Sequence, residues 1–316
     1  MHRCHLAVMF AVLVVAFACR EPNGPAATPD ADANTADAMV GPSDPRDDLA
    51  PAIGTPEALD IATWNIENFP QGASTPILAA GIILSLDLDL IAVQEIANVA
   101  AFDELMAYLP DYDAVLSTDT YSDGSYQKVG FIFRRSLLQA DAVDLLFTSD
   151  WYEFPRPPLE VQFTLVQPES GAPVLDFTAI VVHLKAGVDA EDRDRRRQAV
   201  SALDDYIRAQ IAGAGDDQVL LLGDFNEDLE PGEAQTVWAP ILDAPAVYTL
   251  HTGELNGASF SYIPWTRLID HVISTGPLTD AVTTHTEIPP LDELINGYTS
   301  SVSDHRPVVT SVTGMW

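Results

Sequence analysis

Short apolar stretches that end on a polar residue recur along this chain, and they leave few folds open to it. Ile61–Trp64 leads into Asn65, Leu90–Val93 leads into Gln94 and Glu95, and Leu220–Leu222 leads through Gly223 into Asp224. Short apolar runs bounded by turn residues are typical of strands in a sheet that is covered on both faces. A sheet opens onto a cleft where such strands end. The pattern therefore predicts an α/β fold with polar side chains gathered at one end.

Predicted strands alternate with predicted helices. We expect strands over 59–65, 90–93, 112–116, 129–134, 159–166, 175–184, 219–222, 267–274 and 307–312. We expect helices over 75–86, from the cap Asn98 to Leu109, and over 191–211. The last helix has apolar residues at helical spacing and acidic residues four positions from arginines. Many strands with interspersed helices predict an α/β sandwich of two sheets covered by helices.

The first 19 residues have the composition of a targeting segment. His2 and Arg3 precede an apolar run from Leu6 to Ala18, about 13 residues, which is shorter than the ~20 that a membrane span needs. We therefore expect a signal peptide over residues 1–19. The end of this run, Ala16-Phe17-Ala18-Cys19, resembles a bacterial lipobox. That resemblance implies a lipid anchor on Cys19 and a place in the cell envelope, on the bacterial outer membrane; secretion after ordinary cleavage near Ala18 is the alternative.

Residues 20–60 and 61–316 differ in composition. The first stretch is acidic, rich in Pro, Ala and Asp, and without apolar periodicity, so we expect a disordered linker. The second stretch, about 256 residues without a low-complexity break, is long enough for one domain with a large core. Both cysteines, Cys4 and Cys19, precede it. A cysteine nucleophile, a disulfide and a thiolate metal site are therefore excluded from that domain.

Acidic residues dominate the charge of the chain. There are 47 Asp and Glu against 15 Lys and Arg, which gives a formal net charge of −32. This balance disfavours tight, non-specific DNA binding and favours divalent cations. It leaves open a nuclease that has a local basic cleft.

Eight polar residues lie at or beside the ends of predicted strands. Each alone is more often a cap, a turn residue or a surface charge. Together they are oxygen or imidazole groups that suit metal and acid/base chemistry. They are Asn65, Glu95, His183, Asp224, Asn226, Asp270, Asp304 and His305.

The motifs around these residues resemble those of the endonuclease/exonuclease/phosphatase superfamily, the deoxyribonuclease I-like hydrolases. They occur in the family's order over essentially the whole domain: Thr63-Trp64-Asn65-Ile66-Glu67-Asn68, Gln94-Glu95, His183-Leu184-Lys185, Gly223-Asp224-Phe225-Asn226, Ile269-Asp270 and Ser303-Asp304-His305-Arg306-Pro307. The resemblance implies a four-layer α/β sandwich, in which two mixed β-sheets pack face to face between helices. It also implies a divalent-metal-dependent phosphoesterase.

The resemblance further implies roles for individual residues. Glu95 would be the principal ligand of Mg²⁺, with Asn65 and Asp304 close by, and Mn²⁺ or Ca²⁺ could replace Mg²⁺. His305, oriented by Asp270, would be a general base or a donor to the transition state.

Asp224 would orient or deprotonate the attacking water, and Asn226 and His183 would donate hydrogen bonds to the phosphate. Which of Asp224 and His305 is the base stays open at this point.

A second group of residues could contact substrate. The resemblance implies Tyr126, because relatives carry a polar residue near the metal or phosphate before this strand, and Arg156, which resembles an arginine of the deoxyribonuclease-like members that touches the phosphate backbone. Guanidinium and ammonium groups suit phosphate, so Lys185 is a candidate as well. Trp151, Tyr152 and Trp265 could stack on a base, although packing is the commoner use of such rings.

We therefore expect an exported, monomeric, endonuclease-like phosphodiesterase that hydrolyses nucleic acid. A lipid or small-molecule phosphoesterase, sphingomyelinase-like or inositol-phosphatase-like, is the first alternative, because the surface is acidic and the predicted lipid anchor would tether the chain to a membrane. A non-catalytic binding module on the same scaffold is the second alternative.

Overall fold

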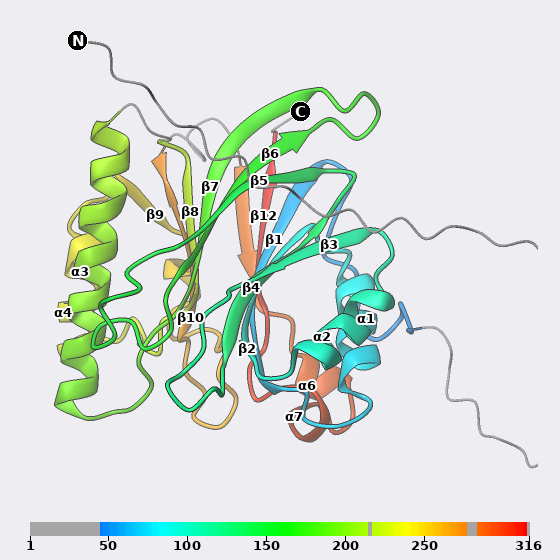
Figure 1. Cartoon of the computed structure of the whole chain (residues 1–316), viewed down its shortest axis with the longest axis horizontal. Coiled ribbons are helices and arrows are strands. Elements are labelled where there is room, and N and C mark those ends of the chain that lie inside the picture. Colours follow the sequence, from blue (N-terminus) through cyan, green and yellow to red (C-terminus); the bar gives the residue numbers. More distant parts are fainter. Residues whose placement is uncertain (1–44, 214–216, 277–282, 315–316) are drawn as a thin grey trace, which may run out of the picture. The chain divides into compact units, whose positions relative to one another are not determined.

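The apolar runs form the strands of two mixed six-stranded sheets in the computed structural model, which describes residues 45–213, 217–276 and 283–314 (Figure 1). The first sheet has the order β11 (Thr283–Glu287), β12 (Val308–Thr313), β1 (Ala58–Phe69), β2 (Leu90–Ile96), β4 (Lys128–Arg134) and β3 (Tyr112–Leu116). The second has the order β5 (Leu138–Leu145), β6 (Leu159–Val166), β7 (Pro173–His183), β8 (Val219–Asp224), β10 (Asp270–Thr275) and β9 (Tyr248–Leu250). Only β1 with β2 and β7 with β8 pair in parallel among these strands.

The two sheets pack face to face around a shared apolar core. Alternate residues of each strand, such as Leu59 and Ile61 of β1 and Leu220 and Leu222 of β8, fill the space between the sheets. The opposite faces carry separate apolar clusters, with Ala62 and Trp64 of β1 in one of them. Both faces of each sheet are therefore buried, which explains why the central strands read as continuous apolar runs.

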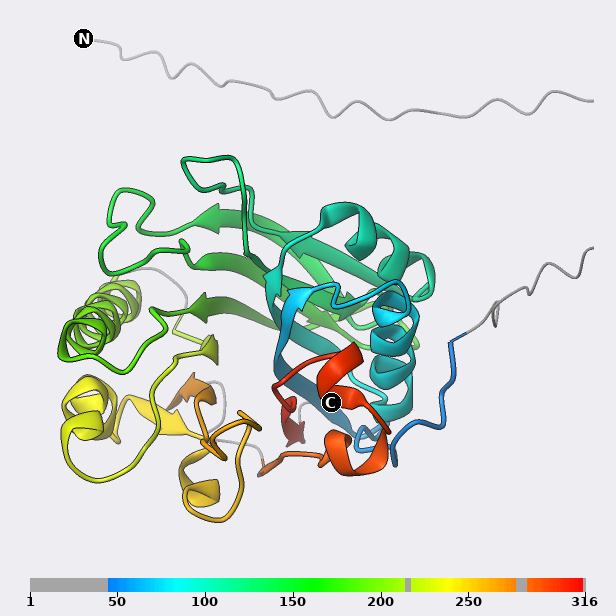
Figure 2. The same cartoon turned by 90° about the horizontal axis from the view of Figure 1, so that it is seen from below.

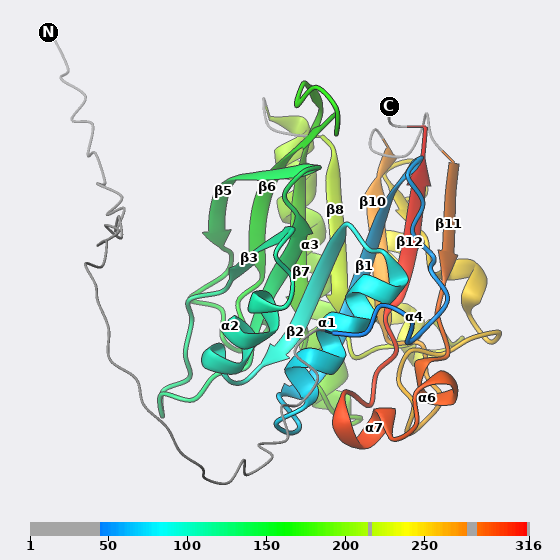
Figure 3. The same ribbon diagram turned by 90° about the vertical axis from the view of Figure 1, so that its right-hand side faces the viewer.

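Helices cover the two outer faces and complete four layers (Figure 3). The first sheet is covered by α1 (Thr75–Leu86), α2 (Val99–Ala107), α6 (Leu291–Leu294) and α7 (Tyr298–Ser301), and the second by α3 (Ala190–Ala212) and α4 (Glu233–Leu242). A short 3-10 turn, η1, spans Gly253–Leu255. This is the predicted four-layer α/β sandwich. Among the residues that the structure describes, no helix is both long and apolar enough to cross a membrane.

The sequence did not predict several elements at the edges of the molecule. The strand β5 alternates exposed and half-buried residues, and it carries polar side chains such as Gln139 and Asp144, so it lacks an apolar run. The elements β9, β11, α4, α6 and α7 were also missed. The strand expected from residue 267 begins at Asp270 as β10, because Arg267 belongs to the hairpin before it.

The folded part of the chain starts before residue 61, where the domain was predicted to begin. The backbone N–H of Leu49 donates to Ser85 Oγ at 2.9 Å, and the N–H groups of Ile53 and Gly54 donate to Leu86 O at 3.2 and 2.9 Å. Leu49 and Ile53 also pack against the cluster under α1. Residues 45–57 therefore form a strap along α1. The predicted signal peptide and the linker up to residue 44 lie outside the described residues.

Gly81 in α1 makes room for this strap. A Cβ atom at Gly81 would lie 2.6 Å from Arg46 O and 2.9 Å from Leu49 Cδ1. Gly→Ala in a helix is otherwise stabilising by about 0.5–1 kcal/mol. We predict that Gly81→Ala instead destabilises the domain by about 1–3 kcal/mol, the usual cost of overpacking, and lowers the melting temperature.

The matched control is Gly253→Ala, at a helical glycine whose added Cβ would meet nothing within 4 Å. Thermal unfolding of both variants beside the wild type measures the difference. A melting temperature of Gly81→Ala at or above that of the wild type would show that the strap does not pack on α1.

Candidate active site

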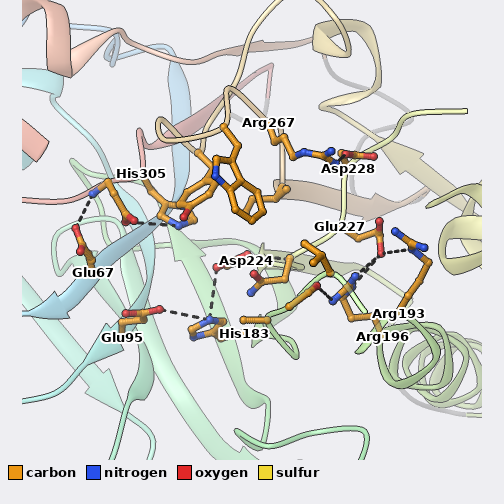
Figure 4. A pocket seen from close by; sticks show the side chains of 18 of the residues that line it. Glu67, Glu95, His183, Arg193, Arg196, Asp224, Glu227, Asp228, Arg267 and His305 are labelled. Carbon is orange, nitrogen blue, oxygen red and sulfur yellow. Dashed lines mark hydrogen bonds and ion pairs between the residues drawn. The ribbon is translucent and has the colours of Figure 1, made fainter. Parts of the chain in front are cut away.

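The cleft lies where the shared core of the two sheets ends in polar side chains. Asn65 continues the inward-facing row of Leu59 and Ile61 on β1, and Asp224 continues that of Leu220 and Leu222 on β8. Because the period of a strand is two residues, the rows that form the core also set the direction of these side chains. Figure 2 looks onto this end of the sheets, and Figure 4 shows the cleft from close by. It has a volume of about 290 Å³.

Six of the eight residues predicted from strand ends line this cleft. They are Glu95, His183, Asp224, Asn226, Asp304 and His305. The other two, Asn65 and Asp270, are fully buried directly behind them and hydrogen-bond to lining residues. All eight thus converge at one place, although they come from six separate segments of the sequence.

Asn65 links the two sheets. Its Nδ2 donates to Asp224 Oδ2 at 3.0 Å and to Glu95 Oε1 at 3.3 Å, while its Oδ1 accepts the N–H of Glu67 at 3.0 Å. The side-chain oxygen thus accepts one backbone N–H, and the nitrogen faces the carboxylates. In this orientation Asn65 positions Glu95 and Asp224, and its role as a metal ligand, which the resemblance implied, stays a prediction.

Glu95 is held in an unusual backbone conformation. Its φ is 63°, in the left-handed region that non-glycine residues rarely adopt, and this turn interrupts the pairing of β2 after Gln94. Glu95 Oε2 accepts the N–H of Asn68 at 2.8 Å, and Asn68 Oδ1 in turn accepts from Gln127 Nε2 at 2.7 Å. The carboxylate is thus directed into the cleft by contacts from β1 and from the segment before β4.

His305 and Asp270 form a buried pair. His305 Nδ1 lies 2.8 Å from Asp270 Oδ2, which leaves Nε2 toward the cleft, 3.8 Å from Asp304 Oδ1. Ser303 fastens this segment to β1, because its Oγ donates to Asn65 O at 2.7 Å and accepts the N–H of His305 at 2.9 Å. Burial alone lowers the pKa of His305, but the charge and hydrogen bond of Asp270 outweigh it and raise that pKa to about 10.

Asp224 and His183 lie side by side opposite this pair. Asp224 Oδ1 accepts the N–H of Asn226 at 2.8 Å, and its Oδ2 lies 3.5 Å from His183 Nε2. Burial, followed by the charge of Asp270, raises the pKa of Asp224 to about 7. Burial lowers the pKa of His183 well below its usual value, so this ring is neutral. A neutral His183 can donate one hydrogen bond from Nε2.

Three carboxylates of the cleft suit a divalent cation. Burial and the charge of Asp304 raise the pKa of Glu67, and burial together with Glu95 raises that of Asp304. Groups that repel one another in this way are stabilised when a cation lies between them, and carboxylate oxygens are the ligands that Mg²⁺ prefers. Glu67, Glu95 and Asp304 would therefore hold the ion. A second group of possible ligands, Asp224, Asp270 and His305, has atoms within 4.8 Å of one another, but Asp270 already binds His305.

Arg156, Lys185 and Tyr126, the three further residues that we expected to contact substrate, are not among the residues that line the cleft. Arg156 donates to Gln127 Oε1 and to the carbonyl oxygens of His183 and Leu184. Lys185 pairs with Asp192 at 2.9 Å. The Tyr126 hydroxyl accepts the N–H of Val99. Their polar groups serve the walls of the site in this structure.

The sequence reading missed several residues that line the cleft. Glu67 had a signal, because it follows Asn65 by two positions on one strand and so faces the same side. The others gave none, since they come from loops and from the start of α3. They are Arg193, Arg196, Glu227, Asp228, Tyr262 and Arg267, whereas Trp265, which also lines the cleft, was named as a possible stacking residue.

Comparison with known proteins decides the family. The model of the endonuclease/exonuclease/phosphatase family matches residues 62–305. The chain belongs to that family. Its members are metal-dependent phosphoester hydrolases, so this chain is an enzyme of that class, and the alternative of a non-catalytic binding module is not supported. No curated protein matches the chain.

Solved structures of this family share the fold. D. rerio TDP2 complexed with single-strand DNA product matches with a TM-score of 0.60 and 15% identity, over 81% of this chain and 99% of that one. A Bacteroides vulgatus endonuclease/exonuclease/phosphatase matches with a TM-score of 0.57 and 18% identity, over 81% of this chain and 98% of that one. The human Nocturnin catalytic domain with bound sulfate matches with a TM-score of 0.58 and 16% identity, over 81% of this chain and 93% of that one.

Metal binding by this enzyme can be measured without substrate. We predict that about 10 mM Mg²⁺ or Mn²⁺ raises the melting temperature of metal-free protein by about 2–6 °C, because a cation that binds only the folded state stabilises it. Glu95→Gln should lose most of this rise, because the substitution removes a charge from the proposed ligand set.

Glu104→Gln is the matched control, since Glu104 is exposed on α2, and it should keep the full rise. An equal rise in Glu95→Gln and in the wild type would place the cation elsewhere.

Proposed function

We propose that this enzyme is a Mg²⁺-dependent phosphodiesterase that hydrolyses nucleic acid. The observation that supports the proposal most is the convergence of a buried His–Asp pair, a buried aspartate and a carboxylate set suited to a cation in one open cleft. Hydrolysis of a phosphodiester requires an activated water, a leaving oxygen and a neutralised phosphoryl group at the same place. These three groups of side chains can meet those requirements together.

The residues divide the chemistry between the two sides of the cleft. Asp224, which accepts hydrogen bonds from Asn65 and Asn226, orients the attacking water and accepts its proton. His305, held by Asp270, donates from Nε2 to a phosphoryl oxygen and stabilises the charge that develops there. His183 and Asn226 donate to the remaining phosphoryl oxygens. Glu67, Glu95 and Asp304 would hold a divalent ion, which would supply further charge neutralisation and polarise the phosphoryl group.

The choice of nucleic acid over other phosphoesters rests on two supports. A protein of the same fold, D. rerio TDP2, is described with a single-strand DNA product. In addition, the guanidinium groups of Arg193, Arg196 and Arg267 line the cleft, where they pair with Glu227 and Asp228, despite the net charge of −32. A lipid or small-molecule phosphoesterase is the outcome that would replace this choice.

A substrate panel with a matched pair of variants tests the proposal. We predict metal-dependent release of nucleotides from single-stranded DNA or RNA, assayed with Mg²⁺, Mn²⁺ and Ca²⁺ in turn. His305→Gln should lower turnover by at least ~10²-fold, the usual scale for one acid/base group. His285→Gln, the same substitution at an exposed histidine of β11, should retain wild-type turnover.

Two results would contradict the proposal. Wild-type turnover in His305→Gln would remove His305 from the mechanism. Hydrolysis of a choline phospholipid or an inositol phosphate, with no release from any nucleic acid, would replace the substrate class.

We further propose that the protein is exported as a monomer and held at the cell envelope by lipid on Cys19, after removal of residues 1–18. The apolar run before Cys19 and the acidic residues after it support this proposal. A tether of this kind would keep the domain from residue 45 onward in the aqueous phase. Full secretion is the alternative.

The two cysteines provide the test. In a bacterial host, Cys19→Ser should move the protein from the detergent phase to the aqueous phase on phase partitioning, whereas Cys4→Ser should partition like the wild type. Mass spectrometry of the mature N-terminus would show a diacylated Cys19. Aqueous partitioning of the wild type would instead indicate plain secretion.

A further inference from the structure

Two exposed tryptophans border hollows on either side of the catalytic cleft. Trp151 is 72% exposed and Trp265 is 59% exposed, and the chemistry proposed above uses neither. We propose that these rings are base-stacking platforms of a two-sided track for single-stranded nucleic acid. The enzyme would then bind nucleotides on both sides of the scissile phosphate and cleave within a strand. This inference rests on the proposed nuclease function.

Trp265 is fixed close to the reacting groups. It lies in a hairpin whose Tyr262 pairs with both Arg267 and His305, and the N–H of Ile263 donates to Asp304 O at 2.9 Å. The Tyr262 ring lies 4.9 Å from the His305 ring and 6.1 Å from the Trp265 ring, measured between centroids. The indole is thus one side chain away from His305, and it lines the cleft with much of its surface exposed.

A second hollow continues the cleft beyond Trp265. Trp265, Arg267 and Asp228 line the catalytic cleft and also this hollow of about 460 Å³, whose far wall is the 256–260 segment. Arg267 forms an ion pair with Asp228. A nucleotide attached to the scissile phosphate on this side could therefore lie over Trp265 and enter the second hollow.

Trp151 is fixed on the opposite side. Arg195 of α3 donates to the carbonyl oxygens of Trp151 and Tyr152, and its guanidinium lies 4.7 Å from the centroid of the Tyr152 ring. The Trp151 ring lines a hollow of about 660 Å³ between the β3–β4 and β5–β6 loops, together with Tyr121 and two prolines. A ring anchored through its backbone can stack without first being ordered.

A hydrogen-bonded ridge joins this third hollow to the catalytic cleft. Arg156 Nη2 donates to Gln127 Oε1 at 3.0 Å, Gln127 donates to Asn68, and Asn68 lines the cleft and donates to Glu95. Pro155 and Pro157, the neighbours of Arg156, line the hollow that contains Trp151. The three hollows are therefore adjacent in series, with the candidate metal ligands in the middle. The loops that carry them lie at one end of the sheets (Figure 2).

The chemistry of the track favours an unpaired strand. Many of the nearby cations are already paired, as Arg267 is with Asp228 and Lys185 with Asp192, and Asp119 and Glu230 line the outer hollows. Attraction for phosphates is therefore weak, and stacking on an aromatic ring must supply more of the binding. A ring can stack on a base only when the base is not stacked inside a duplex. This excludes a duplex as the preferred substrate.

The first experiment asks where the enzyme cuts. Circular single-stranded DNA, linear DNA of the same sequence and its duplex are incubated with the full-length enzyme and Mg²⁺. The track predicts that the circle is opened at a rate within about 3-fold of linear cleavage, and that the duplex is cut at least ~10-fold more slowly. An intact circle beside a shortened linear strand would overturn the proposal, because it would show an enzyme that acts only at ends.

The second experiment asks whether both rings bind the strand. Trp151→Ala and Trp265→Ala should each raise KM for a 20-nucleotide strand on the order of 10-fold, the scale of losing one stacked base. The ratio of strand cleavage to hydrolysis of bis(4-nitrophenyl) phosphate should fall by the same factor in each variant, because this small diester has no neighbouring nucleotides that could stack. Trp→Tyr at either position should restore most of the loss, since the ring is retained.

Leu242→Ala removes an exposed apolar side chain from α4, outside the three hollows, and should change neither activity. An unchanged KM in Trp151→Ala would overturn the two-sided track even if Trp265→Ala were impaired. Loss of both activities together would also overturn it. Failure of the wild type to cleave any nucleic acid would instead reject the proposed function itself.

Discussion

The hydrogen bonds of the Asn65 amide are the contacts on which the site depends most. One nitrogen lies 3.0 Å from an oxygen of Asp224 in the second sheet and 3.3 Å from an oxygen of Glu95 in the first. Without this donor two carboxylates from different sheets would face each other in a buried space, where charge repulsion is weakly screened. The amide therefore lets the apolar core between the sheets end in a group of acids, and it fixes the distance between the two halves of the cleft.

The same principle of placing a donor between acids recurs around the site. His305 separates Asp270 from the carboxylate of Asp304, and His183 lies between Glu95 and Asp224. Asp270 Oδ1 and His183 Nδ1 are buried without a hydrogen-bond partner among the described residues. An arrangement of this kind is stable because the surrounding sheets are rigid, and it leaves the acids ready to bind a cation and a phosphate.

The sequence predicted those parts of the molecule that local pattern determines. The central strands were predicted correctly because burial on both faces makes them continuously apolar. His305 and Asp224 were predicted as site residues because each lies in a motif of a few consecutive residues. Edge strands such as β5 were missed, since half of their residues face water. Trp265 was named only as one of several possible stacking residues, because its relation to His305 depends on a hairpin whose Tyr262 pairs with His305, 43 residues further along the chain. Arg156 and Lys185 were expected at substrate, but Arg156 donates to groups distant in sequence and Lys185 pairs with Asp192 on the following helix.

The left-handed backbone of Glu95 is one of several such conformations at the cleft, with Glu67 at φ 25°, Asn68 at 44° and Asn226 at 54°. Each holds the chain in a conformation that glycine would adopt at lower free energy. Selection for thermal stability alone would therefore favour glycine at these positions, and it would remove side chains that the chemistry requires. Thermostable variants of this enzyme should accordingly be sought in its outer helices and edge strands, where a gain in folding free energy carries no catalytic penalty.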